Sequence, residues 1–168
     1  MSELPLHIEA RSQVGHWECE TVISASHKGA VVTMVERKSG YAVLAKVVNK
    51  TSELVSSAIV SNLKPLSVRV KTLTYDNGKE FAAHGLIDQQ LNSTAYFARP
   101  FASWERGSNE NLNGLLRQYI PKKRAMSTVS DEEIRMIQNR LNNRPRKRLG
   151  FKTPAEVFRQ SLIKGVAL

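Results

Sequence analysis

Residues 17–23 read Trp17-Glu18-Cys19-Glu20-Thr21-Val22-Ile23, a stretch rich in β-branched and aromatic residues that predicts a strand. Successive side chains of a strand point to opposite faces, so Glu18 and Glu20 share one face and Trp17 lies on the other. Glutamate is depleted in strands and is costly to bury without a partner. Two explanations stay open: this acidic face is solvated, or Glu20 takes part in a functional site.

The residues around this stretch predict three antiparallel strands. Short β-branched segments are separated by His27-Lys28-Gly29 and Lys38-Ser39-Gly40, which are typical of hairpin turns. The three segments are residues 16–24, 30–36 and 41–48.

The middle of the chain alternates between helix and strand. Thr51 can cap a helix that Pro65 ends, and Asn77 with Glu80 can form a capping-box-like start for a second helix. A strand is expected after each of the two helices, at residues 68–75 and 95–98. The order predicts an α/β fold with a mixed five-stranded sheet, three antiparallel strands and then two parallel ones, flanked by helices.

Beyond Arg99 the sequence predicts helices. Apolar residues recur at helical spacing over residues 104–120, and Pro121 ends this helix. Two further helices are expected to begin at capping boxes, formed by Ser130 with Glu133 and by Thr153 with Glu156.

The chain is strongly basic. Among 168 residues, 25 Lys and Arg against 15 Asp and Glu give a formal net charge of +10. Residues 99–152 contain 13 of the basic and 5 of the acidic residues. Such an excess indicates a polyanionic partner, although solvated helix faces would produce the same composition.

Composition also excludes several classes of protein. A hydrophobic fraction of 41% fits a globular chain. The single cysteine, Cys19, rules out an intramolecular disulfide framework and a cysteine-based zinc site. No apolar run approaches the roughly 20 residues of a membrane span, and the first residues do not resemble a secretory signal, so we expect a cytoplasmic protein. The histidines show no zinc-like spacing and are expected to be structural: His7, His16, His27 and His84.

Two further acids are candidates for chemistry. Asp76 follows the predicted strand 68–75, at the edge where ligands gather in open α/β sheets, and a turn or capping role is its alternative. Glu110 lies opposite the apolar stripe of its helix, on a face with Arg106, Asn113 and Arg117 that we expect to look away from the packing partner of the helix. An ordinary pair with Arg106 is the alternative for Glu110.

Convergence of Glu20, Asp76 and Glu110 would fit a known kind of chemistry. Cleavage and joining of phosphodiesters commonly use two divalent ions about 3.5–4 Å apart. Mg²⁺ takes oxygen ligands and keeps several waters, so a few carboxylates suffice to hold it.

Five blocks of sequence resemble the catalytic core of bacterial DDE transposases, in particular the insertion-sequence family numbered thirty. One block reads Thr74-Tyr75-Asp76-Asn77-Gly78-Lys79-Glu80-Phe81. The others are residues 15–22 followed by 27–30, residues 99–100, residues 104–114 and residues 143–150. The resemblance spans about residues 15–158 and implies a ribonuclease H-like fold.

The resemblance also implies an activity and a set of ligands. Three acids would bind two Mg²⁺ or Mn²⁺ ions and drive strand cleavage and strand transfer in DNA transposition and integration. Asp76 and Glu110 match the second and third acids, and the 33 residues between them agree with the spacing of the family. The set of catalytic and metal-binding residues is then Glu20, Asp76 and Glu110.

The first acid departs from the family pattern. The family has aspartate in a Trp-Glu-Gly-Asp pattern, whereas this chain has Cys19 and Glu20 at the last two positions. A misplacement of about 1 Å can cost about 10²-fold in rate, so we expect Glu20→Asp to raise Mn²⁺-dependent strand transfer. Glu18, on the same strand face, is a further candidate ligand.

DNA is the implied partner, as element ends and as target, with self-association on DNA and no membrane. Basic side chains expected at phosphates are Lys79, Arg106, Arg117, Lys122, Lys123, Arg124, Arg144, Arg146, Lys147 and Arg148. We divide the chain into an extension (1–14), a catalytic core (15–160) and a tail (161–168). Family members have an N-terminal helix-turn-helix region, for which the residues before Gly15 leave no room, so we expect an isolated core with weak recognition of specific ends.

Other functions stay open. Glutamate at position 20 would also fit a non-catalytic DNA-binding or assembly domain derived from a transposase. A ribonuclease H-type nuclease is the weaker alternative, because the blocks around Asp76 and Glu110 favour a transposase. The aromatic residues Trp17, Phe101 and Trp104 are expected to be core or loop anchors rather than surfaces on which bases stack.

Overall fold

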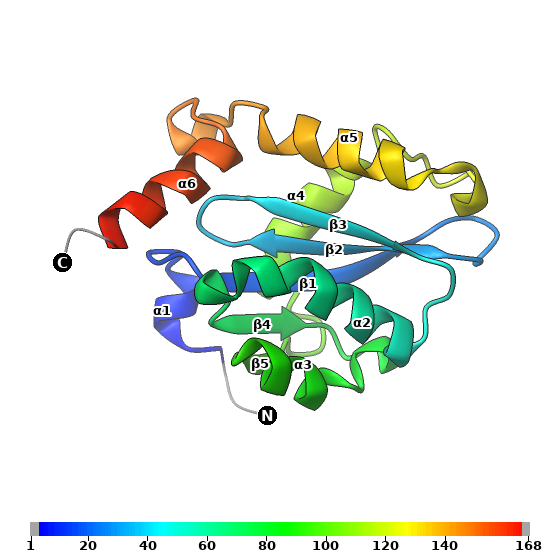
Figure 1. The fold of residues 1–168 in the computed structure, drawn as a ribbon, viewed down its shortest axis with the longest axis horizontal. Coiled ribbons are helices and arrows are strands. Elements are labelled where there is room, and N and C mark those ends of the chain that lie inside the picture. The colour runs from blue at the N-terminus through cyan, green and yellow to red at the C-terminus, as the bar shows by residue number, and fades with distance from the viewer. Residues whose placement is uncertain (1–3, 166–168) are drawn as a thin grey trace.

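A five-stranded mixed sheet forms the centre of the protein (Figure 1), in a computed structural model that describes residues 4–165. Its strands are β1 (His16–Ile23), β2 (Ala30–Glu36), β3 (Ala42–Val47), β4 (Thr72–Tyr75) and β5 (Thr94–Phe97). The spatial order is β3-β2-β1-β4-β5. Strand β2 is antiparallel to β1 and β3, whereas β4 is parallel to β1 and β5. The predicted sheet is therefore confirmed.

Two helices cover one face of the sheet. They are α2 (Ser52–Leu63) and α3 (His84–Leu91), which lie below the central strands in Figure 1. Ile59 and Leu63 of α2 and Ile87 of α3 are fully buried in one hydrophobic core with Trp17 and Cys19 of β1. The apolar face of β1 therefore packs against α2 and α3.

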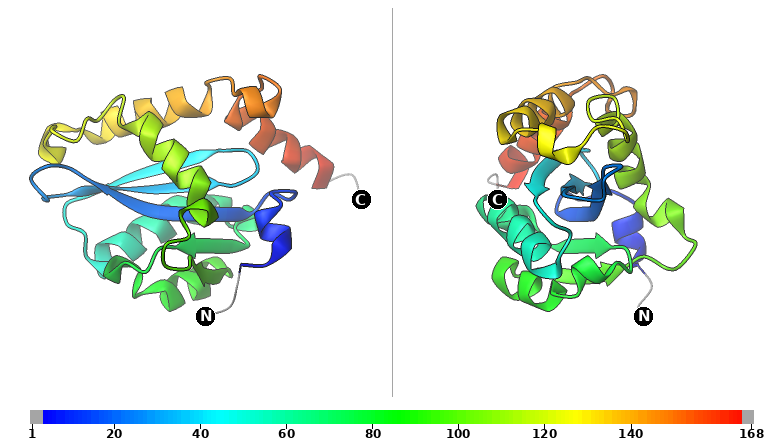
Figure 2. Two further views of the ribbon diagram at one scale, coloured as in Figure 1. Left: turned by 180° about the vertical axis from the view of Figure 1, so that it is seen from behind. Right: turned by 90° about the vertical axis from the view of Figure 1, so that its right-hand side faces the viewer.

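The opposite face is covered by α4 (Gly107–Leu116) and α5 (Asp131–Asn142). Figure 2 shows α4 crossing the strands on this side, with α5 running beside it. Leu112 and Leu116 of α4 and Ile137 of α5 form a second core with Val31 and Val35 of β2. Because α4 lies over β1 and β2, it comes close to the acidic face of β1.

Helix starts follow the predicted capping signals. The Thr51 Oγ1 accepts a hydrogen bond from the Leu54 amide, and the Ser130 Oγ accepts one from Glu133. At α6 (Pro154–Gly165), the Thr153 Oγ1 accepts from the Glu156 amide while the Glu156 carboxylate accepts from the Thr153 amide. This last pair is a complete capping box.

Two local predictions are wrong. The strand expected at 68–75 begins only at Thr72, because residues 64–69 form the 3₁₀ helix η1 (Lys64–Arg69). Asn77 and Glu80 form no capping box: the Asn77 side chain donates to the Ala98 carbonyl, and Glu80 belongs to the 3₁₀ helix η2 (Lys79–Phe81). Both side chains are held by distant partners instead.

The segment predicted as one helix over 104–120 is divided. It contains the 3₁₀ helix η3 (Ser103–Arg106) and then α4, which ends at Leu116. Two more 3₁₀ helices, η4 (Met126–Thr128) and η5 (Lys147–Leu149), connect the last α-helices.

Strand β3 lies at the edge of the sheet, and α5 covers its backbone. The Asn142 side chain accepts a hydrogen bond from the Ala42 amide and donates one to the Ala42 carbonyl, both at 2.8 Å. The Gln138 side chain accepts one from Leu44. These bonds satisfy edge groups that would otherwise be free to pair with another strand.

Residues near both ends of the core domain are also structured. In the predicted extension, α1 (Leu6–Glu9) buries Ile8 completely. Helix α6 continues through Gly165, so the predicted tail begins as helix and its residues 166–168 lie outside the described part of the chain. Within the described residues, none of the helices has the length and apolar character needed to cross a membrane.

Candidate functional site

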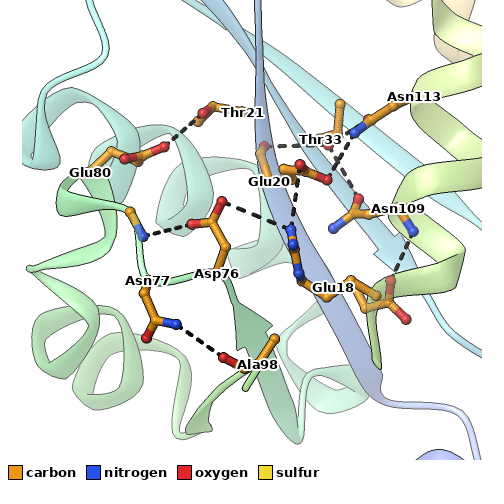
Figure 3. Close-up of polar contacts among 12 residues, drawn as sticks. Glu18, Glu20, Thr21, Thr33, Asp76, Asn77, Glu80, Ala98, Asn109 and Asn113 are labelled. Atoms are coloured by element: carbon orange, nitrogen blue, oxygen red, sulfur yellow. Dashed lines mark hydrogen bonds and ion pairs between the residues drawn. The ribbon is translucent and has the colours of Figure 1, made fainter. Parts of the chain in front are cut away.

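Glu20 and Asp76 come together at the junction of the two central parallel strands (Figure 3). The register of β1 and β4 sets Glu18 opposite Thr74, two residues before each of these acids. Glu20 is still within β1, whereas Asp76 directly follows the end of β4. The side chains are 26% and 32% exposed, respectively. The pairing of β1 with β4 thus places Glu20 and Asp76 side by side, and both side chains are partly exposed to solvent. We call these two residues the acid pair.

Arg106 links the two carboxylates. Its Nη1 lies 3.4 Å from Oε1 of Glu20 and 3.9 Å from Oδ2 of Asp76. Arg106 ends η3 and immediately precedes α4, so the start of α4 places its guanidinium between the two strands. The carboxylates therefore share one cation.

Helix α4 contributes two asparagines to the same site. The Asn113 Nδ2 donates to Oε2 of Glu20 at 2.9 Å. The Thr33 hydroxyl, on β2, lies within hydrogen-bonding distance of the side-chain oxygens of Asn109 and Asn113 and of the Glu20 carbonyl. Asn109 and Asn113 are four residues apart and so lie on one helix face. This polar face fixes the carboxylate of Glu20 from the side opposite Asp76 (Figure 3).

The environment changes the pKa of Glu20. Burial raises the pKa of this carboxyl, and the negative charge of Asp76 raises it further. Arg106 and the hydrogen bond from Asn113 oppose the rise without cancelling it. An added cation near Glu20 would stabilise the ionised form for the same reason that Arg106 does.

Glu18 has a structural role on the same strand face. It is fully buried, its Oε1 lies 3.1 Å from Nη1 of the buried Arg37, and its Oε2 accepts a hydrogen bond from the Asn109 amide at 2.8 Å. Burial raises the pKa of Glu18, against the effect of Arg37. The explanation that this strand face is solvated is therefore wrong for Glu18, because α4 covers it.

Glu110 takes no part in the contacts that link the other two acids within the described part of the chain. Its side chain is exposed, and within the described part of the chain it makes no hydrogen bond or ion pair. No three His, Cys, Asp or Glu side chains of residues 4–165 with described side chains gather closely enough to hold a metal ion. The structure thus brings Glu20 and Asp76 together through Arg106, whereas Glu110 is an exposed residue of α4. We expected this helix face to look away from the packing partner of α4, and this prediction is wrong in part, because Asn113 and Arg117 of the same face contact β1.

The turn after Asp76 is crowded by carboxylates. Oδ1 of Asp76 accepts a hydrogen bond from the Gly78 amide at 2.8 Å. Glu80 is buried, and its Oε1 lies 2.8 Å from both the Thr21 hydroxyl and the Lys50 Nζ. A Cβ at Gly78 would lie 2.7 Å from Oδ1 of Asp76 and closer still to Oε2 of Glu80. A larger residue at position 78 would therefore have to displace one or both of these carboxylates.

The loop between β5 and α4 is held by an ion pair. The Arg99 side chain contacts Oε1 of Glu105 through two nitrogens at 2.7 Å, and the Arg99 amide donates to Oε2 of Glu105. Glu105 is itself buried. This pairing fixes the segment that leads to Arg106.

Two aromatic side chains of this loop face solvent. Phe101 is 100% exposed and Trp104 is 69% exposed, so the prediction that they are anchors is wrong for both, whereas Trp17 is in the core. Phe101 lines an open pocket of about 290 Å³ together with Asp76, Asn77 and Arg106. The exposed ring of Phe101 therefore lies beside Asp76.

The predicted phosphate-binding residues differ in their surroundings. Arg106 is at the acid pair, Arg117 donates to the Ile23 carbonyl, and Arg124 makes two bonds to Glu133 at 2.6 and 2.7 Å. Arg146 is half-buried. The remaining members are exposed: Lys79, Lys122, Lys123, Arg144, Lys147 and Arg148.

Sequence reasoning missed Thr33, Glu105, Asn109 and Asn113 as members of this site. The asparagines had one signal, their spacing of four residues within the block 104–114 that resembles a transposase. Thr33 and Glu105 had none, because their partners are distant in sequence or lie in a loop of irregular structure.

The chain is similar to transposases of several bacterial insertion sequences. The transposase for insertion sequence element IS4351 of Bacteroides fragilis is 44% identical over 160 residues, which are 95% of this chain and 49% of that protein. The transposase InsI for element IS30A of Escherichia coli (strain K12) is 38% identical over 98% of this chain and 43% of its own length. The transposase for IS1086 of Cupriavidus metallidurans is 38% identical over 94% and 47%. The chain spans about half the length of these relatives.

The fold matches a solved integrase structure. The catalytic core domain of BIV integrase superposes with a TM-score of 0.68, over 92% of this chain and 99% of that chain, at 21% sequence identity. No family model matches the chain. The predicted resemblance and the predicted fold are both confirmed by these comparisons. Over nearly its whole length the chain is therefore a homologue of insertion-sequence transposases such as those of IS4351 and IS30A, and it has the fold of an integrase catalytic core.

Proposed function

We propose that this chain is the catalytic core of a transposase and that it cuts and joins DNA strands by using Glu20, Asp76 and Glu110 with divalent ions. The observation that carries the proposal is the pairing of Glu20 and Asp76 from adjacent parallel strands around one cationic group, Nη1 of Arg106. The similarity to transposases over nearly the whole chain supports the same activity.

The acid pair fits a hard divalent ion. Mg²⁺ and Mn²⁺ prefer oxygen ligands, which both side chains supply, and the guanidinium of Arg106 stands where a cation is attracted by both carboxylates. Glu20 and Asp76 would hold the ion, and Glu110 is the proposed third ligand, one residue from Asn109 on α4. When bound, the ions would activate the attacking oxygen and stabilise the leaving oxygen.

The proposed reaction has two steps that balance without a protein nucleophile. In the first, a water oxygen bonds to phosphorus, the bond from phosphorus to the 3′ oxygen breaks, and that oxygen gains a proton. In the second, the freed 3′-hydroxyl oxygen bonds to a target phosphorus while the bond to the target 3′ oxygen breaks and that oxygen takes the proton. The residues of the chain orient the strands and hold the carboxylates in place through Asn113 and Gly78.

The surface around the acid pair suits a DNA strand. Arg106 and the exposed Lys79, which lies in the turn after Asp76, provide positive charge for phosphates. The exposed rings of Phe101 and Trp104 provide apolar faces on which an unpaired base can stack. We propose that the DNA end lies along the loop between β5 and α4.

Calorimetric titration with Mn²⁺, combined with strand transfer of a pre-nicked DNA end, tests this function. We expect Mn²⁺ binding and Mn²⁺-dependent joining for the chain, loss of both in Asp76→Asn, and retention of both in Asp131→Asn, which removes an exposed acid at the start of α5. Salt-sensitive DNA binding without Mn²⁺ binding or joining, in the chain and in Glu20→Asp alike, would show instead a DNA-binding or assembly domain.

A further inference from the structure

A second polar pocket lies on the other side of α4 from the acid pair. It encloses about 170 Å³, and its basic members come from two segments that are far apart in the chain. Its lining includes Arg11, Arg146 and Arg148, together with Asn111, Leu112 and Leu115 of α4. We call it the arginine pocket.

The position of the arginine pocket follows from helix geometry. Asn109 and Asn113 face β1 and contact Glu18 and Glu20. Asn111 and Leu115 are also four residues apart, but successive residues are about 100° apart around a helix, so these two lie on a different side. A ligand in the arginine pocket is therefore separated from Glu20 by the body of α4.

The charges of the arginine pocket are not neutralised by ion pairs. In the described part of the chain, none of Arg11, Arg146 and Arg148 forms an ion pair with an acid. Arg146 donates to the Leu141 carbonyl and Arg148 to the Lys38 carbonyl, each at 3.0 Å. A guanidinium has five N–H donors, so most of the donors of each group remain for a ligand.

Arg148 also lies close enough to Arg11 and to Arg146 for their positive charges to repel. Burial lowers the pKa of Arg148, and the charge of Arg11 lowers it further. Burial lowers the pKa of Arg146 as well, with added contributions from Arg144 and Arg148. The nearby acid, Glu36, is fully buried and already accepts bonds from the Gly15 amide and from the amide and hydroxyl of Ser39. An anion is what would relieve this repulsion.

We propose that the arginine pocket binds a phosphate group, held by Arg11, Arg146 and Arg148. Guanidinium groups bind phosphate oxygens in a bidentate manner, and the apolar side chains of Leu112 and Leu115 limit the space at the base of the pocket. Helix α4 begins at Gly107 beside the pocket, so its positive end favours an anion there. Because α4 separates the two sites, this phosphate is not the phosphodiester that reacts at Glu20 and Asp76.

The position of Arg11 distinguishes the arginine pocket from a generally basic surface. It lies in the segment before β1, whereas Arg146 and Arg148 follow α5, so a bound phosphate would join the two segments across the start of α4. The phosphate can belong to a DNA backbone or be a free anion. The inference that it belongs to DNA rests on the proposed function, whereas the inference that the pocket binds free phosphate does not.

Inorganic phosphate is the first probe. We expect it to raise the melting temperature of the chain above that in chloride at equal ionic strength. Arg11→Gln and Arg148→Gln should abolish this increase. Arg159→Gln, which removes one charge from the exposed face of α6, should retain it. Circular dichroism of each variant shows whether the fold is kept.

Duplex DNA is the second probe, with affinity measured as a function of salt. Arg11→Gln should lose one phosphate contact, so the fall of log K with log salt concentration should become less steep by about 0.9. This loss corresponds to about eightfold weaker DNA binding at 0.1 M salt. If phosphate binds through Arg11 and Arg148 but DNA affinity does not change, the ligand is a free phosphate. If phosphate stabilises Arg11→Gln and Arg148→Gln as much as Arg159→Gln, the proposal is overturned, whatever the result of the strand-transfer assay.

Discussion

The Nη1 atom of Arg106 lies between two carboxylates that are 56 positions apart in the chain, 3.4 Å from Glu20 and 3.9 Å from Asp76. Strand pairing brings the acids together, and the start of α4 supplies the cation. The positive guanidinium reduces the repulsion between the two carboxylates. A divalent ion bound by both carboxylates would have the same effect and would occupy the same position. The ion and Arg106 are therefore expected to compete.

Replacement of Arg106 by glutamine should strengthen Mn²⁺ binding. The variant removes a positive charge that a bound ion must displace, and ion pairs of this exposure contribute about 0.2–1 kcal/mol, so the gain should be up to about fivefold. Isothermal calorimetry measures the effect, with Arg140→Gln on the exposed side of α5 as a control for net charge. Weaker Mn²⁺ binding in Arg106→Gln would contradict competition.

Glu20→Asp should raise Mn²⁺-dependent strand transfer, by up to about 10²-fold. Aspartate has the side-chain length found at this position in the family pattern. The shorter side chain also withdraws the carboxylate from the Asn113 amide, so a bound ion would not have to replace that hydrogen bond. Single-turnover joining of a pre-nicked end measures the rate. Unchanged or slower joining would count against a misplaced carboxylate.

Gly78→Ala should destabilise the protein by about 1–3 kcal/mol, because the new Cβ would lie within 2.7 Å of oxygens of both Asp76 and Glu80. Gly85→Ala is the matched control, since a Cβ there meets nothing within 4 Å and the position is in helix α3. Alanine at 85 should be neutral or stabilise by about 0.5–1 kcal/mol. Urea unfolding of both variants checks the contrast, and equal stabilities would refute the steric requirement.

Glu80 should contribute stability only above mildly acidic pH. Burial acts to raise its pKa, but hydrogen bonds from Lys50 and Thr21 outweigh this effect, so the pKa is lowered from 4.5. A lowered pKa gives stability that is present above pH 4.5 and lost as pH falls through the folded-state pKa. Glu80→Gln should therefore cost about 1–2 kcal/mol at pH 7 and progressively less below pH 4.5.

The control for this pH dependence is Glu53→Gln, which changes an exposed acid of α2. Its free energy of unfolding should follow that of the parent chain at every pH. A constant difference between Glu80→Gln and the parent from pH 7 to pH 3 would mean that the carboxylate charge of Glu80 has no part in stability.

Local signals made much of the fold predictable. Thr51, Ser130 and Thr153 start helices because a capping side chain bonds to an amide only a few residues away. The alternation in residues 17–23 fixed the faces of β1 correctly, since Trp17 is in the core and Glu18 and Glu20 face α4. The Asn77 and Glu80 prediction failed because partners on other segments, Ala98, Thr21 and Lys50, replaced the local ones.

The site was only partly predictable for the same reason. Glu20 and Asp76 could be paired from the expected strand order, whereas the burial of Glu18 depends on Arg37, whose side chain is positioned by tertiary contacts. The exposure of Phe101 and Trp104 had no sequence signal, because aromatic residues are usually buried. The role of Glu110 as a third ligand stays a prediction.

The most direct test is a crystal of the chain soaked with Mn²⁺ and measured for anomalous scattering. We predict manganese coordinated by carboxylate oxygens of both Glu20 and Asp76, with the Arg106 guanidinium displaced and Glu110 turned toward the ion. Manganese elsewhere, with Arg106 still between the two carboxylates at saturating Mn²⁺, would contradict the account.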